Sequence, residues 1–409
     1  MDSNLLRKYA ALAVKMGVNI QKDDILVINS PIDTAEFARN LADEAYKLGA
    51  KEVVVHYNDS KLTKIKLTHS TIETLSDFPE WQSESVNSYS RKGACFISIS
   101  AADPDALKGV DMAKIGAAQK ARSIALKEHS ANAMSNKCRW CVIAMPTVAW
   151  AKKVFPTLSD DEAVESLLET IFKTVRIDKE DPIAAWDDHN NYLNEKIDFM
   201  NKNNFTKLFF KNTKGTDLTI DLPNNHIWCG GGENDVNGIM FNANMPTEEV
   251  FTLPKKTGVN GIVYSTKPLI YGGNQINDFS LTFKDGKVVD YTANEGYDVL
   301  KTMLETDEGA KYLGEVALVP FDSPISNTNL IFYNTLFDEN AACHLALGKA
   351  YTSCIKDSES MSKEELEVAG VNTSLIHEDF MIGSEDLVVT GLNEKGETVT
   401  IFSDGNWAF

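Results

Sequence analysis

Short apolar runs alternate with amphipathic stretches along the first half of the chain. The apolar runs are rich in β-branched residues, which is typical of buried strands; they cover residues 24–29, 52–56, 94–99 and 140–145. After the first run, Phe37, Leu41 and Ala45 recur every four residues and predict a helix over 34–49. A second long helix is predicted over 111–131. Strands separated by helices are typical of parallel βαβ units.

The pattern changes near residue 203, where period-two strands replace helices. Two helices precede this change, over 160–175 with Ser159 as its N-cap and over 181–201. Predicted strands follow at 205–210, 216–223, 262–266 and 279–283. Turn-forming residues at 284–287 and 393–396 predict two hairpins. The α/β chain is therefore expected to form a βαβ-type N-terminal domain over 1–200 and a strand-rich α+β C-terminal domain over 201–409.

Composition narrows the classes of function. The chain has 409 residues, 43% of them hydrophobic and 24% charged, as expected of a globular protein. Its net charge of −19 and the lack of a basic stripe argue against a nucleic-acid partner. No apolar stretch is long enough to span a membrane, and the first residues lack a signal-peptide core, so a cytoplasmic location is expected.

Two familiar kinds of site are not favoured. A dinucleotide-binding domain needs a glycine fingerprint after its first strand, and NSPIDT follows the first apolar run instead. The six cysteines are too sparse for a disulfide scaffold. Cys138 and Cys141 form a CxxC, but no second pair completes a zinc site. Their position at the start of an apolar run favours a structural role in the core.

Acidic and imidazole side chains in the second half are the best candidates for chemistry. His377 and Asp379 are two residues apart, so on a strand their side chains would point the same way. Together they could supply two ligands to one divalent cation. Glu315 lies within the apolar string LGEVALVP. A buried carboxylate there needs a cationic partner, a shared proton or a metal ion.

The segment 338–351 is also rich in such groups. It reads as an amphipathic helix carrying Glu339, His344 and Tyr351. Five helical positions separate the first two by about 140° in projection, so they would share a site only if Glu339 lies at the start of the helix. Imidazole and carboxylate ligands suit Zn, Co or Mn, and bridging carboxylates suit a two-metal site. Each residue alone is also consistent with an ordinary core histidine, an ion pair or, for Glu248-Glu249, a solvated turn.

Four strings in this half, taken in order, resemble one family. NMPTEEVFT, LGEVALVP, FDENAACHLALGKAY and IHEDFMIGS resemble the thermophilic-type metallo-aminopeptidases, the aminopeptidase S and aminopeptidase T family. The resemblance covers the whole chain and is most specific over 244–384. It implies a dinuclear, metal-dependent exopeptidase with an α/β N-terminal domain, which serves oligomerisation or substrate access, a C-terminal catalytic domain and a homodimeric assembly.

The resemblance also assigns roles by position. Two divalent ions (Zn, Co, Mn or Mg) are expected, with Glu315 shared between them and Tyr351 as an active-site tyrosine. The metal ligands that it implies are Glu249, Glu315, Glu339, His344, His377 and Asp379.

These roles suggest a mechanism for removing N-terminal residues from peptides. A hydroxide held between the two cations would attack the scissile carbonyl, and one metal or a nearby carboxylate would bind the free α-amine of the peptide. Tyr351 would donate a hydrogen bond to the oxyanion, and Glu315 or Glu248 would move the proton. Two other classes stay open: a different dinuclear hydrolase, such as a phosphoesterase, and a non-catalytic α/β binding protein.

Overall fold

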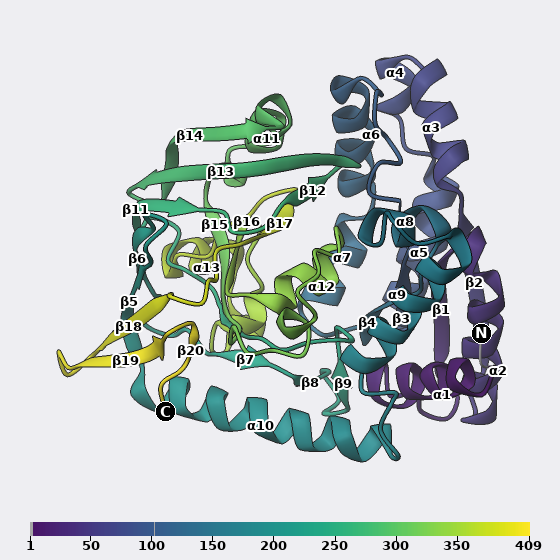
Figure 1. Ribbon diagram of the computed structural model, residues 1–409, viewed down its shortest axis with the longest axis horizontal. Coiled ribbons are helices and arrows are strands. Elements are labelled where there is room, and N and C mark those ends of the chain that lie inside the picture. The colour runs from purple at the N-terminus through teal and green to yellow at the C-terminus, as the bar shows by residue number, and fades with distance from the viewer. Residues whose placement is uncertain (1–2, 102) are drawn as a thin grey trace. The chain divides into compact units, whose positions relative to one another are not determined.

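The computed structural model describes residues 3–101 and 103–409 (Figure 1). The chain divides into two compact units. Unit 1 contains the described residues up to Asn191 together with Gly231–Thr247 and Phe332–Leu336. Unit 2 contains Tyr192–Gly230, Glu248–Ile331 and Phe337–Phe409.

Unit 1 is built on a four-stranded parallel sheet. Its strands are β1 (Ile25–Pro31), β2 (Glu52–Asn58), β3 (Cys95–Ser100) and β4 (Trp140–Ala144). They pair in the order β2-β1-β3-β4, all in parallel. The four strands predicted from the apolar runs and their βαβ connections are therefore confirmed.

The helices of unit 1 connect and cover these strands. Within this part of the chain they are α1 (Ser3–Leu12), α2 (Ala35–Lys47), α3 (Ser60–His69), α4 (Ile72–Leu75), α5 (Glu80–Arg91), α6 (Met112–Ala125), α7 (Lys127–Met134), α8 (Val148–Val154) and α9 (Asp160–Thr174). Ser159 caps α9 through a capping box with Glu162, as its position predicts. The single helix predicted over 111–131 is wrong, because Leu126 leaves the helical conformation and separates α6 from α7. His129 of α7 lies against Phe96 of β3, with ring centroids 4.4 Å apart.

Unit 2 contains two antiparallel sheets. The larger sheet has nine strands: β5 (Phe205–Lys211), β6 (Asp217–Asp221), β11 (Val259–Tyr264), β12 (Leu269–Tyr271), β13 (Asn274–Lys284), β14 (Lys287–Glu295), β18 (Val388–Asn393), β19 (Thr398–Ser403) and β20 (Asn406–Trp407). The smaller has five: β7 (Cys229–Gly230), β10 (Val250–Thr252), β15 (Leu313–Leu318), β16 (His344–Gly348) and β17 (His377–Met381). Both predicted hairpins are confirmed, as β13–β14 and β18–β19.

Two helices lie in unit 2, α11 (Tyr297–Leu304) and α13 (Lys363–Ala369), and two cross a boundary between the units, α10 (Pro182–Asn203) and α12 (Thr335–Asp338). A short hairpin in unit 1 pairs β8 (Gly232–Asn234) with β9 (Met240–Asn242). One boundary between the units falls inside α10, after Asn191, and another falls inside α12, after Leu336.

The apolar core of unit 2 lies against one face of the five-stranded sheet. Val316 of β15, Leu345 and Leu347 of β16 and Phe380 of β17 all belong to this core. Phe380 also contacts Phe279 of the nine-stranded sheet, with ring centroids 5.5 Å apart. Because side chains alternate along a strand, the intervening residues point to the opposite face.

The helix predicted over 338–351 is wrong. Only residues up to 341 form helical turns, and His344–Gly348 is the strand β16. Ala and Leu favour helices in isolation, but β16 pairs with β15 on one side and β17 on the other, and this pairing overrides the local preference. In the part of the chain that the structure describes, no helix has both the length and the apolar composition to cross a bilayer.

Candidate metal centre

Strand register brings four of the predicted ligands onto one face of the five-stranded sheet. Glu315 of β15 pairs with Ala346 of β16, which in turn pairs with Asp379 of β17. His344 and His377 lie two residues before Ala346 and Asp379, so they share this face. Ala346, which has a small side chain, therefore lies between the two carboxylates in the register. This is the face turned away from the apolar core.

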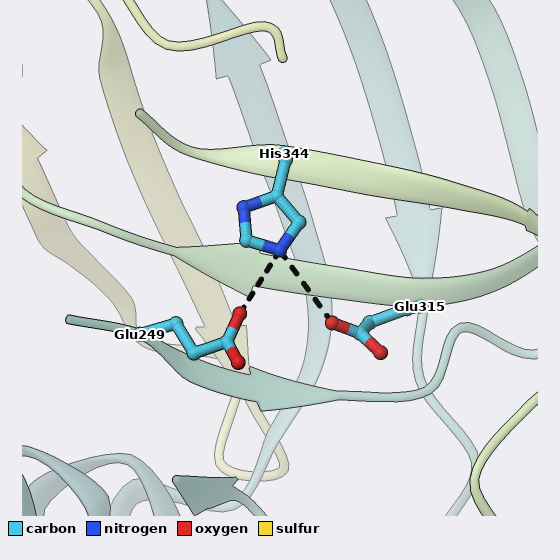
Figure 2. Close-up of side chains that lie close together, drawn as sticks. All are labelled: Glu249, Glu315 and His344. Carbon is cyan, nitrogen blue, oxygen red and sulfur yellow. Dashed lines mark ion pairs between the residues drawn. The ribbon is translucent and has the colours of Figure 1, made fainter. Parts of the chain in front are cut away.

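Glu249 reaches the same place from a neighbouring strand. It directly precedes β10, which pairs with β15. Figure 2 shows the carboxylates of Glu249 and Glu315 both pointing towards the His344 ring. His344 Nε2 lies 3.0 Å from Glu249 Oε2 and 3.6 Å from Glu315 Oε1.

Glu315 joins two groups of donor atoms. Its Oε1 faces His344, whereas its Oε2 lies 3.5 Å from His377 Nε2. The same nitrogen of His377 lies 3.6 Å from Asp379 Oδ1. Two triads result, Glu249–Glu315–His344 and Glu315–His377–Asp379, and within each the donor atoms lie within 4.8 Å of one another. The one residue common to both is Glu315.

Backbone carbonyls hold both imidazoles in a ligand-ready tautomer. His344 Nδ1 is 3.1 Å from the carbonyl oxygen of Ala342, and His377 Nδ1 is 2.6 Å from that of Lys349. A carbonyl only accepts, so each Nδ1 must carry the proton and donate it. Each Nε2 therefore faces the carboxylates, as is common for histidines that bind metals.

The protonation of this cluster is strongly perturbed. Burial raises the pKa of Glu315 to about 7, although the two nearby histidines oppose the change. Burial alone would lower the pKa of His344, but the carboxylates of Glu249 and Glu315 that face its Nε2 outweigh burial and raise this pKa well above the usual value. The pKa of His377 is also raised, because the charges of Asp379 and Glu315 overcome burial. Without a cation, the cluster therefore retains protons.

The donor set fits divalent cations. Three of the four contacts, at 3.5–3.6 Å, are too long for good hydrogen bonds. Two donors that each lie roughly 2.1 Å from one shared ion are separated by about 3.0–3.4 Å, which is close to the spacing observed. Asp379 Oδ1 is also buried without a hydrogen-bond partner, an arrangement that is costly unless a cation compensates it.

The remaining predicted residues lie around these triads. Glu339 is buried outside both of them, and burial, followed by the charges of Asp379 and Glu249, raises its pKa well above the usual value. The Tyr351 ring lies edge-on to that of His377, with centroids 5.0 Å apart. Glu248 is buried beside Glu249, which excludes the solvated turn considered for this pair.

Some features of the site were missed from sequence. The carbonyls of Ala342 and Lys349, which orient the histidines, carry no residue-type signal. Glu378, which lies between His377 and Asp379, was also assigned no role from sequence. Alternation along β17 turns it away from the cluster, and burial raises its pKa to about 8.

The CxxC pair lies elsewhere, in unit 1. Cys138 and Cys141 are free and buried. Burial raises the pKa of both thiols, which disfavours the reactive thiolate. Neither belongs to a potential metal-binding group among the described residues. These observations support the structural role expected for the pair.

The raised pKa values predict how the stability of the metal-free protein depends on pH. The folded-state pKa of Glu315 lies above its usual value of 4.5, so its contribution to stability is complete below that value and is lost as pH rises towards 7. The raised pKa values of His344 and His377 extend this loss to higher pH. With a chelator present, the free energy of unfolding should fall as pH rises from about 4.5 to about 7, and it should continue to fall above pH 7.

Urea denaturation at a series of pH values measures this dependence. Glu315→Gln removes the titrating carboxyl group while preserving its shape, so the fall should be shallower in this variant. An equal or steeper fall in Glu315→Gln would contradict the assignment.

Comparisons with known proteins identify the family of the chain. The thermophilic metalloprotease (M29) family profile matches residues 2–407. Aminopeptidase 2 of Geobacillus stearothermophilus is 50% identical over 404 residues, 99% of this chain and 98% of that protein. Aminopeptidase AmpS of Bacillus subtilis (strain 168) is 47% identical over 407 residues, 100% and 99% of the two chains.

A solved structure supports the fold as well. Wild-type AmpT from Thermus thermophilus superposes with a TM-score of 0.91 at 39% identity, and the match covers 100% of both chains. The α/β fold class and the resemblance suggested by the four motifs are thereby confirmed. The chain belongs to the thermophilic metalloprotease (M29) family.

Proposed function

We propose that this protein is a metal-dependent aminopeptidase that uses two divalent cations to remove N-terminal residues from peptides. The observation that carries the proposal is the position of Glu315, whose two carboxylate oxygens face two different histidines. The family relationship adds support, because relatives that match nearly the whole chain are named aminopeptidases.

The two triads would hold the two ions. Glu249, Glu315 and His344 would bind one, and Glu315, His377 and Asp379 the other. We propose Glu339 as a further metal ligand outside the two triads, because its carboxyl group interacts electrostatically with residues of both. When bound, Zn, Co, Mn or Mg would polarise the scissile carbonyl and lower the pKa of a water molecule.

The protein side chains have their own tasks in this reaction. Carboxylates at the cluster attract the α-ammonium group of a peptide, which would restrict cleavage to the N-terminal residue. Tyr351, whose ring packs against those of His377 and Phe251, would donate a hydrogen bond to the oxyanion. The buried Glu248, or Glu315, would move the proton to the leaving amine.

Other parts of the proposal concern the whole protein. We assign catalysis to the C-terminal part, residues 201–409, because all six proposed ligands lie there. We assign oligomerisation or control of substrate access to residues 1–200. A homodimer in the cytoplasm is the assembly and location that we expect.

Substrate choice and chelation test this function together. Aminoacyl-p-nitroanilides should be hydrolysed, N-acetylated versions should not, and p-nitrophenyl phosphate should be inert. EDTA should abolish the activity, and Zn, Co or Mn should restore it. Hydrolysis of the phosphate ester instead would favour a phosphoesterase, and indifference to EDTA would contradict a metal-dependent reaction.

Tyr351→Phe tests the role of the tyrosine hydroxyl. Loss of an oxyanion donor should lower kcat by roughly 10²–10³ while KM changes little. Tyr291→Phe is a matched control, because it removes a hydroxyl from the β13–β14 hairpin. Steady-state kinetics of both variants decide the point, and full activity in Tyr351→Phe would remove this residue from the mechanism.

A further inference from the structure

Asn340 connects two chain segments that carry proposed metal ligands. It follows Glu339 in the turn before β16, and its side chain is fully buried. Its neighbours on the C-terminal side, Ala341 and Ala342, are small and apolar. Burying a side-chain amide costs free energy unless both its N–H donor and its oxygen acceptor form hydrogen bonds. The hydrogen-bond partners of Asn340 therefore indicate its role.

The two ends of this amide bond to two different segments. Asn340 Oδ1 accepts a hydrogen bond of 2.7 Å from the backbone N–H of Glu248, the residue before Glu249. Asn340 Nδ2 donates a long hydrogen bond of 3.4 Å to Glu339 Oε1. One planar amide therefore links the backbone of Glu248, two residues before β10, to the Glu339 carboxyl group.

The turn that carries Asn340 is itself held in place. The carbonyl oxygen of Asn340 accepts a hydrogen bond of 3.2 Å from Ser323 Oγ, and Ser323 is fully buried. Ser323 Oγ also accepts a bond from the backbone N–H of Ser326. The Asn340 amide thus extends from a turn whose backbone is held by hydrogen bonds, so the position of the amide is fixed.

We propose that Asn340 is a positioning residue that fixes Glu249 and Glu339 relative to each other before a metal ion binds. The inference rests on the proposed function, because it assumes that these carboxylates bind the ion. A glutamate side chain has several rotatable bonds, and ordering it when the ion arrives would weaken binding. Partners of this kind, one step removed from the ion, typically contribute 10–100-fold to metal affinity.

Isothermal titration calorimetry tests the proposal without relying on activity. The protein is first freed of metal with a chelator, the chelator is removed, and Co²⁺ alone is then titrated in. Asn340→Ala removes both hydrogen bonds, and Asn340→Leu removes them while preserving the side-chain volume. Both variants should bind Co²⁺ about 10–100-fold more weakly than the wild type. Their urea midpoints in chelator show whether a loss of affinity reflects global unfolding.

Asn393→Ala is the matched control. Asn393 is also buried and bonds Glu397 through its amide, but it is the last residue of β18, before the turn to β19. This control should keep wild-type affinity for Co²⁺. Wild-type affinity in a folded Asn340 variant would overturn the positioning role, and so would failure of both variants to fold. Absence of Co²⁺ binding by the wild type would instead refute the proposed function itself.

Discussion

Compensation of buried negative charge is the constraint on which the site depends. Glu315 lies in the middle of a fully buried strand, and Glu249, Glu339 and Asp379 surround it within unit 2. Carboxylates so close together, in an environment poorer in water than the surface, repel one another strongly unless positive charge is present. Protons can supply that charge, as the raised pKa values of Glu315 and His344 show. Divalent cations would supply more positive charge than protons do, and they would bind to the same donor atoms.

The fold makes this concentration of charge tolerable by keeping it on one face of a sheet. The opposite face of β15 and β16 carries Val316, Leu345 and Leu347, whose burial stabilises unit 2. On the site face, Ala346 and Gly348 occupy positions directly opposite Asp379 and His377. Larger residues there would fill the space that the ligands and ions need. Strand alternation thus separates the site from the large apolar core of unit 2.

Part of this arrangement follows from sequence, and part does not. Short β-branched runs predicted the strands of unit 1, and the i, i+2 spacing of His377 and Asp379 placed both correctly on one face of a strand. The Leu- and Ala-rich segment around His344 was predicted as a helix, because only long-range pairing with β15 and β17 makes it a strand. For the same reason, spacing alone did not show that Glu249 would meet His344, and only the resemblance to a family implied it. The carbonyls that orient the histidines and the bridging amide of Asn340 depend on tertiary structure.

The metal-to-chain ratio tests the central claim most directly. Elemental analysis of the purified wild-type protein should give two divalent ions per chain. Glu315→Ala should bind essentially none, because it removes the one ligand common to both triads. A metal-free wild-type protein, or an unchanged ratio of two in folded Glu315→Ala, would contradict the account.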